Sequence, residues 1–225
     1  MGKVIFFDVG GTLIRTARPV GYYYAEMASH YGVKADELVL QEGFKAAWKE
    51  VKSRDPVLGS RVQDDKAWWK SLVRKTWENQ ALSDTFPFDD YFEELYNWFE
   101  RPEVWRIFPE VEECLIFLQN QGYRLGILSN WDLRLRKILQ GLELDVYFED
   151  MIISSEVGVE KPHALIFNIA LERFKIKASQ AVLIGDEPDF DQLGAVKAGW
   201  QVGLVQRPEV DLFHVLVSMG LKEGC

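Results

Sequence analysis

The sequence predicts an α/β fold: a Rossmann-like parallel sheet with helices on both faces, plus a small all-helical domain. Two observations lead to this prediction. From about residue 103, short apolar runs alternate with segments of helical periodicity, which is typical of a parallel sheet covered by helices. Residues from about 17 to 100 instead show helical periodicity without strand-like runs. The length of 225 residues is sufficient for one α/β domain with such an insertion.

The first predicted element is a strand that ends in a carboxylate. The apolar run Val4–Phe7 is of the kind buried in a parallel sheet. It is followed by Asp8 and by Gly10 and Gly11, which allow the backbone to turn sharply. Asp8 is therefore expected at the carboxyl end of a strand, where open α/β sheets bind ligands. Taken alone, the segment fits a simple turn equally well.

The helical segment that follows is expected to be a packed module. Residues 54–59 read as a turn between helices. The three tyrosines at 22–24 are expected to pack between helices rather than to face a substrate. A broad apolar face is indicated by side chains at four-residue spacing, namely Trp68 with Leu72, and Trp69 with Val73 and Trp77.

The second half of the chain supplies the remaining strands. Helices are predicted over 111–121, 133–140, 164–174 and 192–198, and strands over 123–129, 151–154, 181–185 and 201–205. The domain organisation that follows is an α/β core of residues 1–16 and 101–225, interrupted by a helical domain of residues 17–100.

Composition narrows the possible partners. The net charge of −9, with scattered basic residues, disfavours a nucleic-acid or anionic-membrane surface and fits a small soluble substrate. The sequence shows neither a signal peptide nor a membrane-spanning run, so a cytoplasmic monomer or homodimer is expected. Two cysteines indicate no disulfide framework or thiolate metal site, and Cys114 is expected in the core.

Three polar signals follow the later strands. Ser129 and Asn130 end a strand and could hold an anionic oxygen, although Ser-Asn is also an ordinary helix N-cap. Lys161 precedes a predicted helix and could neutralise a transferred group, although an isolated lysine is usually a solvated charge. The carboxylates from Asp186 to Asp191 favour a hard cation such as Mg²⁺, although a solvated acidic loop fits equally well.

Taken in order, these signals resemble the four motifs of the haloacid dehalogenase superfamily, subfamily I type. Asp8 matches the nucleophile motif, Ser129 the second motif, Lys161 the third, and Asp186 with Asp191 the fourth. The resemblance spans nearly the whole chain. It identifies the helical segment 17–100 with the family's small cap domain, which closes over the active site.

The resemblance also implies roles. Asp8 would form an aspartyl-phosphate, and the second and third motif residues, Ser129 and Lys161, would act with it as catalytic residues. Phosphoryl oxygens would be bound at Gly11, Thr12, Ser129, Asn130 and Lys161. Mg²⁺ would be held by Asp8, the backbone carbonyl of Gly10, Asp186 and Asp191. The implied activity is a Mg²⁺-dependent phosphatase acting on a small phosphorylated metabolite.

The chain departs from the family pattern at Gly10. The family's phosphatases carry a second aspartate there, the expected general acid, whose help is typically worth about 10² to 10⁴-fold. Acyl phosphates, aryl phosphates or substrate-assisted reactions would suffer least from its loss. A weakly active or non-catalytic phospho-ligand-binding protein is therefore an alternative.

Two further chemistries rank lower. A 2-haloacid dehalogenase also lacks the second aspartate, but it uses no metal, and the carboxylates would repel its anionic substrate. A phosphonate hydrolase needs a cap lysine, and nothing marks Lys34, Lys45 or Lys49 as special.

Overall fold

The computed structural model describes residues 2–52, 65–78, 80 and 82–223. Within these, the chain forms two compact units. We call them the α/β unit, which comprises the residues up to Arg15 and those from Arg106 onwards, and the helical unit, which lies between Thr16 and Trp105. The predicted turn at 54–59 lies outside the described residues.

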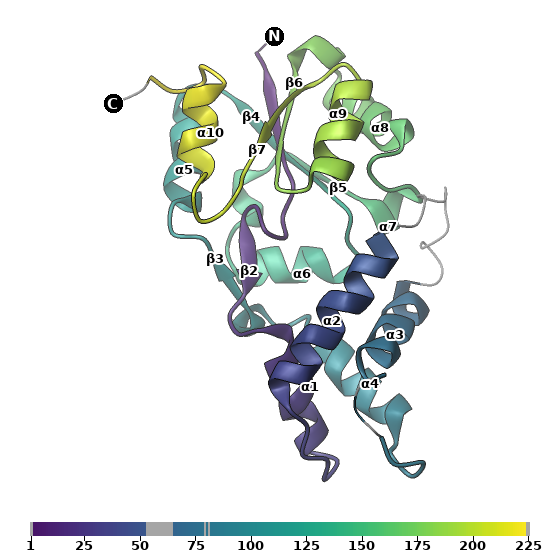
Figure 1. Ribbon diagram of the computed structural model, residues 1–225. Helices are drawn as coiled ribbons and strands as arrows, with labels where there is room; N and C mark the ends of the chain where they lie inside the picture. Colours follow the sequence, from purple (N-terminus) through teal and green to yellow (C-terminus); the bar gives the residue numbers. More distant parts are fainter. Residues whose placement is uncertain (1, 53–64, 79, 81, 224–225) are drawn as a thin grey trace. The chain divides into compact units, whose positions relative to one another are not determined.

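The α/β unit is built on a five-stranded parallel sheet (Figure 1). Its strand order is β5-β4-β1-β6-β7, so the first strand of the chain lies at the centre. The strands are β1 (Val4–Phe7), β4 (Arg124–Ser129), β5 (Asp150–Ile153), β6 (Ala181–Gly185) and β7 (Gln201–Leu204). The predicted fold class is therefore confirmed, and each of the five predicted strands lies within a residue of its observed position.

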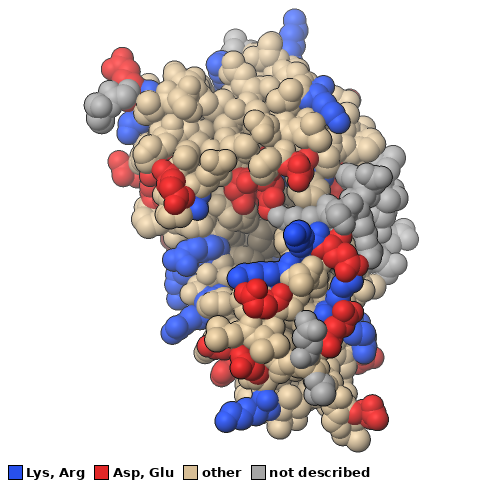
Figure 2. Space-filling view, viewed as in Figure 1, with Lys and Arg blue, Asp and Glu red and all other residues tan. Residues whose placement is uncertain are grey.

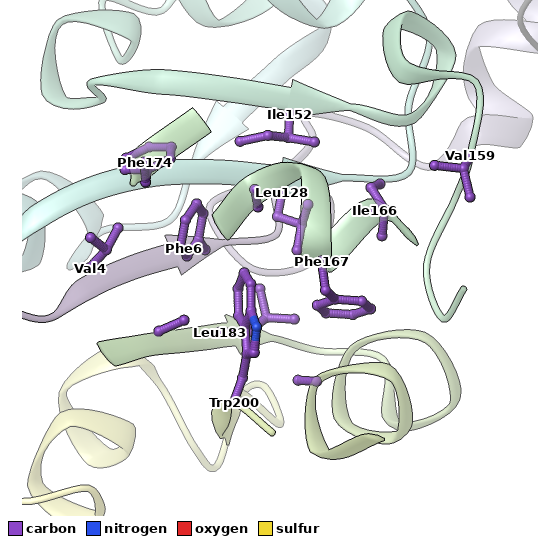
Figure 3. Close-up of a cluster of buried hydrophobic side chains, with 13 residues drawn as sticks. Val4, Phe6, Leu128, Ile152, Val159, Ile166, Phe167, Phe174, Leu183 and Trp200 are labelled. Atoms are coloured by element: carbon purple, nitrogen blue, oxygen red, sulfur yellow. The ribbon is translucent and has the colours of Figure 1, made fainter. Parts of the chain in front are cut away.

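Apolar residues on both faces of β1 fix this strand in the core. Val4 and Phe6 belong to one buried cluster, which also receives side chains from α8 (Ala164–Phe174) (Figure 3). The Phe6 ring lies 4.7 Å from that of Phe174 and 4.9 Å from that of Trp200. A Cβ at Gly126 would come within 2.6 Å of Phe174, so only glycine allows β4 to approach these rings. Tight packing of this kind places the end of β1 with little freedom.

Helices cover both faces of the sheet, with α8 and α9 on one side and α5 and α10 on the other (Figure 1). The helices in addition to α8 are α5 (Val111–Asn120), α6 (Arg134–Gly141), α7 (Ser154–Val157), α9 (Leu193–Lys197) and α10 (Leu212–Ser218). The predicted helix over 192–198 is shorter than expected, because a π turn at Pro188–Gln192 precedes α9. Two observed helices, α7 and α10, were not predicted, and α7 is too short to show helical periodicity. Cys114, on α5, is buried as predicted.

The helical unit contains α1 (Val20–Ser29), α2 (Glu37–Lys52), α3 (Asp65–Thr76) and α4 (Phe88–Trp98). Tyr23 and Tyr24 are buried, which confirms their packing role. The expected apolar face is only partly buried. Leu72, Val73 and Trp77 are buried, whereas Trp68 and Trp69 are half-buried and pack against Trp48.

Two short strands that the sequence analysis did not predict lie where the chain passes from one unit to the other. They are β2 (Ile14–Thr16) and β3 (Trp105–Ile107), and they pair with each other. None of the described helices is long and apolar enough to cross a membrane. Among the described residues on the face shown in Figure 2, lysines and arginines are interspersed with acidic residues.

Candidate active site

Asp8 lies at the end of the central strand, and a tight turn follows it. Its backbone N–H donates to the carbonyl of Ile184 on β6 at 2.9 Å, and its side chain is almost fully buried. The turn is closed by a hydrogen bond from Leu13 N to Val9 O at 2.8 Å. Gly11 has a φ of 78°, and a Cβ there would lie 2.2 Å from Asp186 Oδ2. Both the backbone conformation and the close approach of Asp186 therefore require glycine at position 11.

Two donors from distant parts of the chain reach the Asp8 carboxylate. The Ser129 hydroxyl, at the end of β4, donates to Asp8 Oδ1 at 2.8 Å. The Lys161 ammonium also donates to Asp8 Oδ1 at 2.8 Å, and to Asp191 Oδ1 at 2.5 Å. Lys161 is only 2% exposed, so it is a buried charge held between two carboxylates rather than a solvated surface lysine.

Three carboxylates meet at this point. Oxygen atoms of Asp8, Asp186 and Asp191 all lie within 4.8 Å of one another. Asp186 is held by the Thr12 hydroxyl, which donates to its Oδ1 at 3.0 Å. Asp189, from the same acidic segment, is exposed and takes no part in the cluster. An all-oxygen donor set of this kind fits Mg²⁺, which is usually bound through one or two carboxylates together with water and phosphate oxygens.

Burial and neighbouring charges shift the pKa values of the site. Burial raises the pKa of the Asp8 carboxyl, and Lys161 opposes this. Burial and the neighbouring Asp8 raise the pKa of Asp186 to about 7. Burial alone would lower the pKa of Lys161, but Asp191 and Asp8 outweigh it and raise that pKa. One ammonium therefore faces three carboxylates, and a divalent cation would balance the remainder.

The π turn after β6 places Asp191. This residue is completely buried, and its Oδ2 accepts a hydrogen bond from the backbone N–H of Glu187 at 3.0 Å. A Cβ at Gly185 would lie 2.2 Å from the same carboxylate oxygen. The acid at position 191 thus folds back over the end of β6, toward Asp8, because position 185 has no side chain.

Two residues expected to bind phosphoryl oxygens have other partners. The Asn130 side chain donates from Nδ2 to the Lys161 carbonyl at 2.9 Å and accepts at Oδ1 from the Lys161 N–H at 2.8 Å. Its amide thus fixes the Lys161 backbone. The Thr12 hydroxyl donates its hydrogen bond to the Asp186 carboxylate. Both residues position the groups beside them.

Arg207 is a residue that the sequence analysis did not identify. Its guanidinium donates from Nε to the Gly11 carbonyl at 3.2 Å and from Nη2 to the Thr12 carbonyl at 2.8 Å. Nη2 also pairs with Glu110 Oε1 at 2.5 Å, and the group lies 3.6 Å from the centroid of the Phe108 ring. The only available signal was the position of Arg207 shortly after a predicted strand.

Comparison with known proteins places the chain in a family. The family model for haloacid dehalogenase-like hydrolases matches residues 3–199. The mouse (Mus musculus) haloacid dehalogenase-like hydrolase domain-containing protein 3 is 31% identical over 227 residues, which cover 96% of this chain and 90% of that protein. Glyceraldehyde 3-phosphate phosphatase from Methanothermobacter thermautotrophicus is 38% identical over 118 residues, which cover 49% of this chain and 50% of that enzyme.

Among solved structures, 2-haloacid dehalogenase from Pseudomonas syringae pv. Tomato DC3000 superposes with a TM-score of 0.62 at 24% identity. The superposition covers 98% of this chain and 97% of that one, and it shows a shared fold. The motif resemblance, the family match and the shared fold lead to the same conclusion: the chain belongs to the haloacid dehalogenase-like hydrolases.

Proposed function

We propose that this hydrolase is a Mg²⁺-dependent phosphatase for a small phosphorylated metabolite and that it acts through an aspartyl-phosphate on Asp8. The observation that carries the proposal is the buried Asp8 carboxylate, which shares Lys161 with Asp191 and lies beside Asp186. In this proposal Asp8 is the nucleophile, Lys161 is the cation for phosphoryl oxygens, and the three carboxylates form the cation site.

The residues support a two-step displacement. Both side-chain donors contact Asp8 Oδ1, which leaves Oδ2 to attack phosphorus while the bond to the leaving oxygen breaks. Water then attacks the aspartyl-phosphate, and inorganic phosphate departs as the carboxylate is regenerated. Ser129 and Lys161 can turn toward the phosphoryl oxygens and stabilise their charge. Mg²⁺, when held by Asp8, Asp186, Asp191 and the Gly10 carbonyl, would neutralise phosphoryl charge as a Lewis acid.

The helical segment 17–100 is proposed to serve as the cap that excludes water and selects the substrate. Because Gly10 supplies no general acid, we expect slow turnover of alkyl phosphates and faster turnover of esters whose leaving group needs no proton. The similarity to glyceraldehyde 3-phosphate phosphatase supports phosphatase chemistry, and the acidic cluster argues against dehalogenation because it would repel a haloacid carboxylate.

The decisive experiment compares Asp8→Asn with Asp189→Asn, which changes an exposed acid of the fourth motif segment. Hydrolysis of an activated aryl phosphate should require Mg²⁺ and fall to background in Asp8→Asn, whereas Asp189→Asn should retain it. Calorimetric titration with Mg²⁺ should show at least about tenfold weaker binding in Asp186→Asn than in Asp189→Asn. Wild-type turnover that equals that of Asp8→Asn, or chloride release from a haloacid, would overturn the proposal.

A further inference from the structure

The space beside Gly10 is occupied by an indole ring. A Cβ built on Gly10 would lie 3.1 Å from Cζ3 and 3.8 Å from Cη2 of Trp131. The first distance is shorter than ordinary van der Waals contact, so a side chain at position 10 requires the ring to shift. Cζ3 and Cη2 are carbon atoms and have no proton to give. The group nearest to position 10 is therefore apolar and cannot replace the absent acid.

Trp131 is held firmly by its backbone. Its N–H donates to the Ser154 hydroxyl at 3.1 Å, and the same hydroxyl donates to the Trp131 carbonyl at 3.1 Å. The N–H of Ser155 donates to that carbonyl at 3.2 Å. On the other side, Asp132 and Arg134 form a buried ion pair, with Nη2 and Oδ2 2.6 Å apart. The indole is thus attached to a fixed backbone, and Trp131 as a residue is half-buried.

Trp131 is also linked to the nucleophile through the chain. It lies two residues after Ser129, which donates to Asp8, and directly after Asn130, which fixes Lys161. Trp131, Gly10 and Asp8 all belong to the α/β unit. An aromatic side chain on a fixed backbone therefore lies beside the position where the family's phosphatases have their acid.

We propose that Trp131 is a specificity-determining residue and that its indole contacts the leaving group of a planar, aromatic phosphate ester. The inference rests on the proposed phosphatase function and names its substrate class. Asp8 Oδ2 forms the bond to phosphorus, and the electron pair of the breaking P–O bond remains on the aryl oxygen. The resulting aryl oxide is stable enough to leave without a proton and takes one later from solvent. Ring–ring contact with the indole favours such a group over an alkyl group.

The first test separates ring contact from leaving-group acidity. We compare phenyl phosphate with a fluorinated alkyl phosphate whose alcohol is as acidic as phenol. In Trp131→Leu, kcat/KM for phenyl phosphate should fall by up to about tenfold, the upper end of the range for aromatic pairs, with little change for the fluoroalkyl ester. Trp131→Phe should recover most of the loss. Leu133→Ala, which changes an exposed residue of the same loop, should leave the ratio of the two substrates unchanged.

Inhibition supplies a readout independent of turnover. Phenylphosphonate should inhibit more strongly than methylphosphonate, and this preference should fall about tenfold in Trp131→Leu. If Trp131→Leu lowered kcat/KM or inhibitor affinity equally for the aromatic and alkyl compounds, the role of Trp131 would be overturned. The proposed phosphatase function would not be affected. Absence of Asp8-dependent turnover would instead overturn the proposed function, and this inference with it.

A double-mutant cycle tests the contact with position 10. Gly10→Asp alone should give little gain toward an alkyl phosphate, because its Cβ meets the indole. Gly10→Asp combined with Trp131→Ala should gain more than the two single variants together, with native circular dichroism confirming that each variant folds. Additive effects would show that contact with the indole does not limit the activity of the Gly10→Asp variant toward the alkyl phosphate.

Discussion

Lys161 has an unusual electrostatic position for a lysine. Its ammonium is buried and forms hydrogen bonds with both Asp8 and Asp191. Together the two carboxylates raise the pKa of this ammonium above the usual value for lysine. The stabilisation from these ion pairs is therefore fully present at neutral pH, and it is lost only when the pH rises through the raised pKa. The same residue thus compensates the charge of two carboxylates and, in the proposed function, also binds phosphoryl oxygens.

Removal of the Lys161 ammonium should therefore destabilise the metal-free protein. We expect Lys161→Met to lower the free energy of unfolding at pH 7.5 by about 3–5 kcal/mol, because two buried carboxylates lose their partner. The loss should shrink at pH 5, since unpaired carboxylates are protonated more readily. Urea unfolding without Mg²⁺ measures both values, and exposed Lys197→Met provides the control. If both variants changed the free energy of unfolding by the same small amount, the buried ion pairs would make no net contribution to stability.

At the level of single residues, the sequence predicted which side chains gather but not all of their partners. Asp8, Ser129 and Asp186 lie at the carboxyl ends of parallel strands, which share one edge of the sheet, so their proximity follows from the fold. The contacts of Asn130 and Thr12 depend on atomic positions that strand order does not determine. The same limit applies to Trp131, whose relation to Gly10 is visible only in three dimensions.

Among the structural elements, the turn after β1 depends on Arg207, which comes from the segment after β7. The guanidinium binds two consecutive carbonyls of this turn and is itself held by Glu110 and Phe108. A planar group with several fixed donors can make these contacts at the same time, whereas an ammonium cannot. Arg207 therefore supports the turn that places Gly11 and Thr12 against Asp186.

Arg207→Lys should consequently weaken both the fold and the cation site. We expect a loss of about 1.5–3 kcal/mol in unfolding free energy, the range for hydrogen bonds to charged groups. Mg²⁺ affinity, measured by calorimetry, should fall in parallel. The matched control is Arg136→Lys, which changes a more exposed arginine that pairs with Glu156 and should cost about 0–1 kcal/mol. Identical values for the two variants would contradict a positioning role for Arg207.

Element length explains what could be predicted at this level. The strands and the longer helices of the α/β unit were predicted closely because their apolar periodicity extends over enough residues. The three-residue strands β2 and β3, the four-residue helix α7 and the π turn at Pro188–Gln192 show no such period. The π turn matters most for function, because it directs Asp191 back toward Asp8.

At the scale of the whole molecule, every residue of the candidate site lies in the α/β unit. Ligands of this site should therefore stabilise that unit in particular. Mg²⁺ and vanadate at about 100 times their dissociation constant should raise the free energy of unfolding of this unit by about 2.7 kcal/mol. Amide hydrogens of β1, β4 and β6 that exchange through global unfolding should then exchange about a hundredfold more slowly. Hydrogen-exchange mass spectrometry should show a smaller change in α1 and α4. Equal slowing in both units would show that they unfold as one.

The central position of β1 has a consequence for synthesis. This strand leaves the ribosome before its two neighbours in the sheet, β4 and β6, which are encoded more than a hundred residues later. The helical unit between them is complete earlier and can fold while the sheet is still unfinished. Translation that stops before β6 would leave the apolar strand Val4–Phe7 with an open edge, the feature that promotes aggregation. Asp8 is thus translated early, but the candidate site around it forms only when most of the chain has been made.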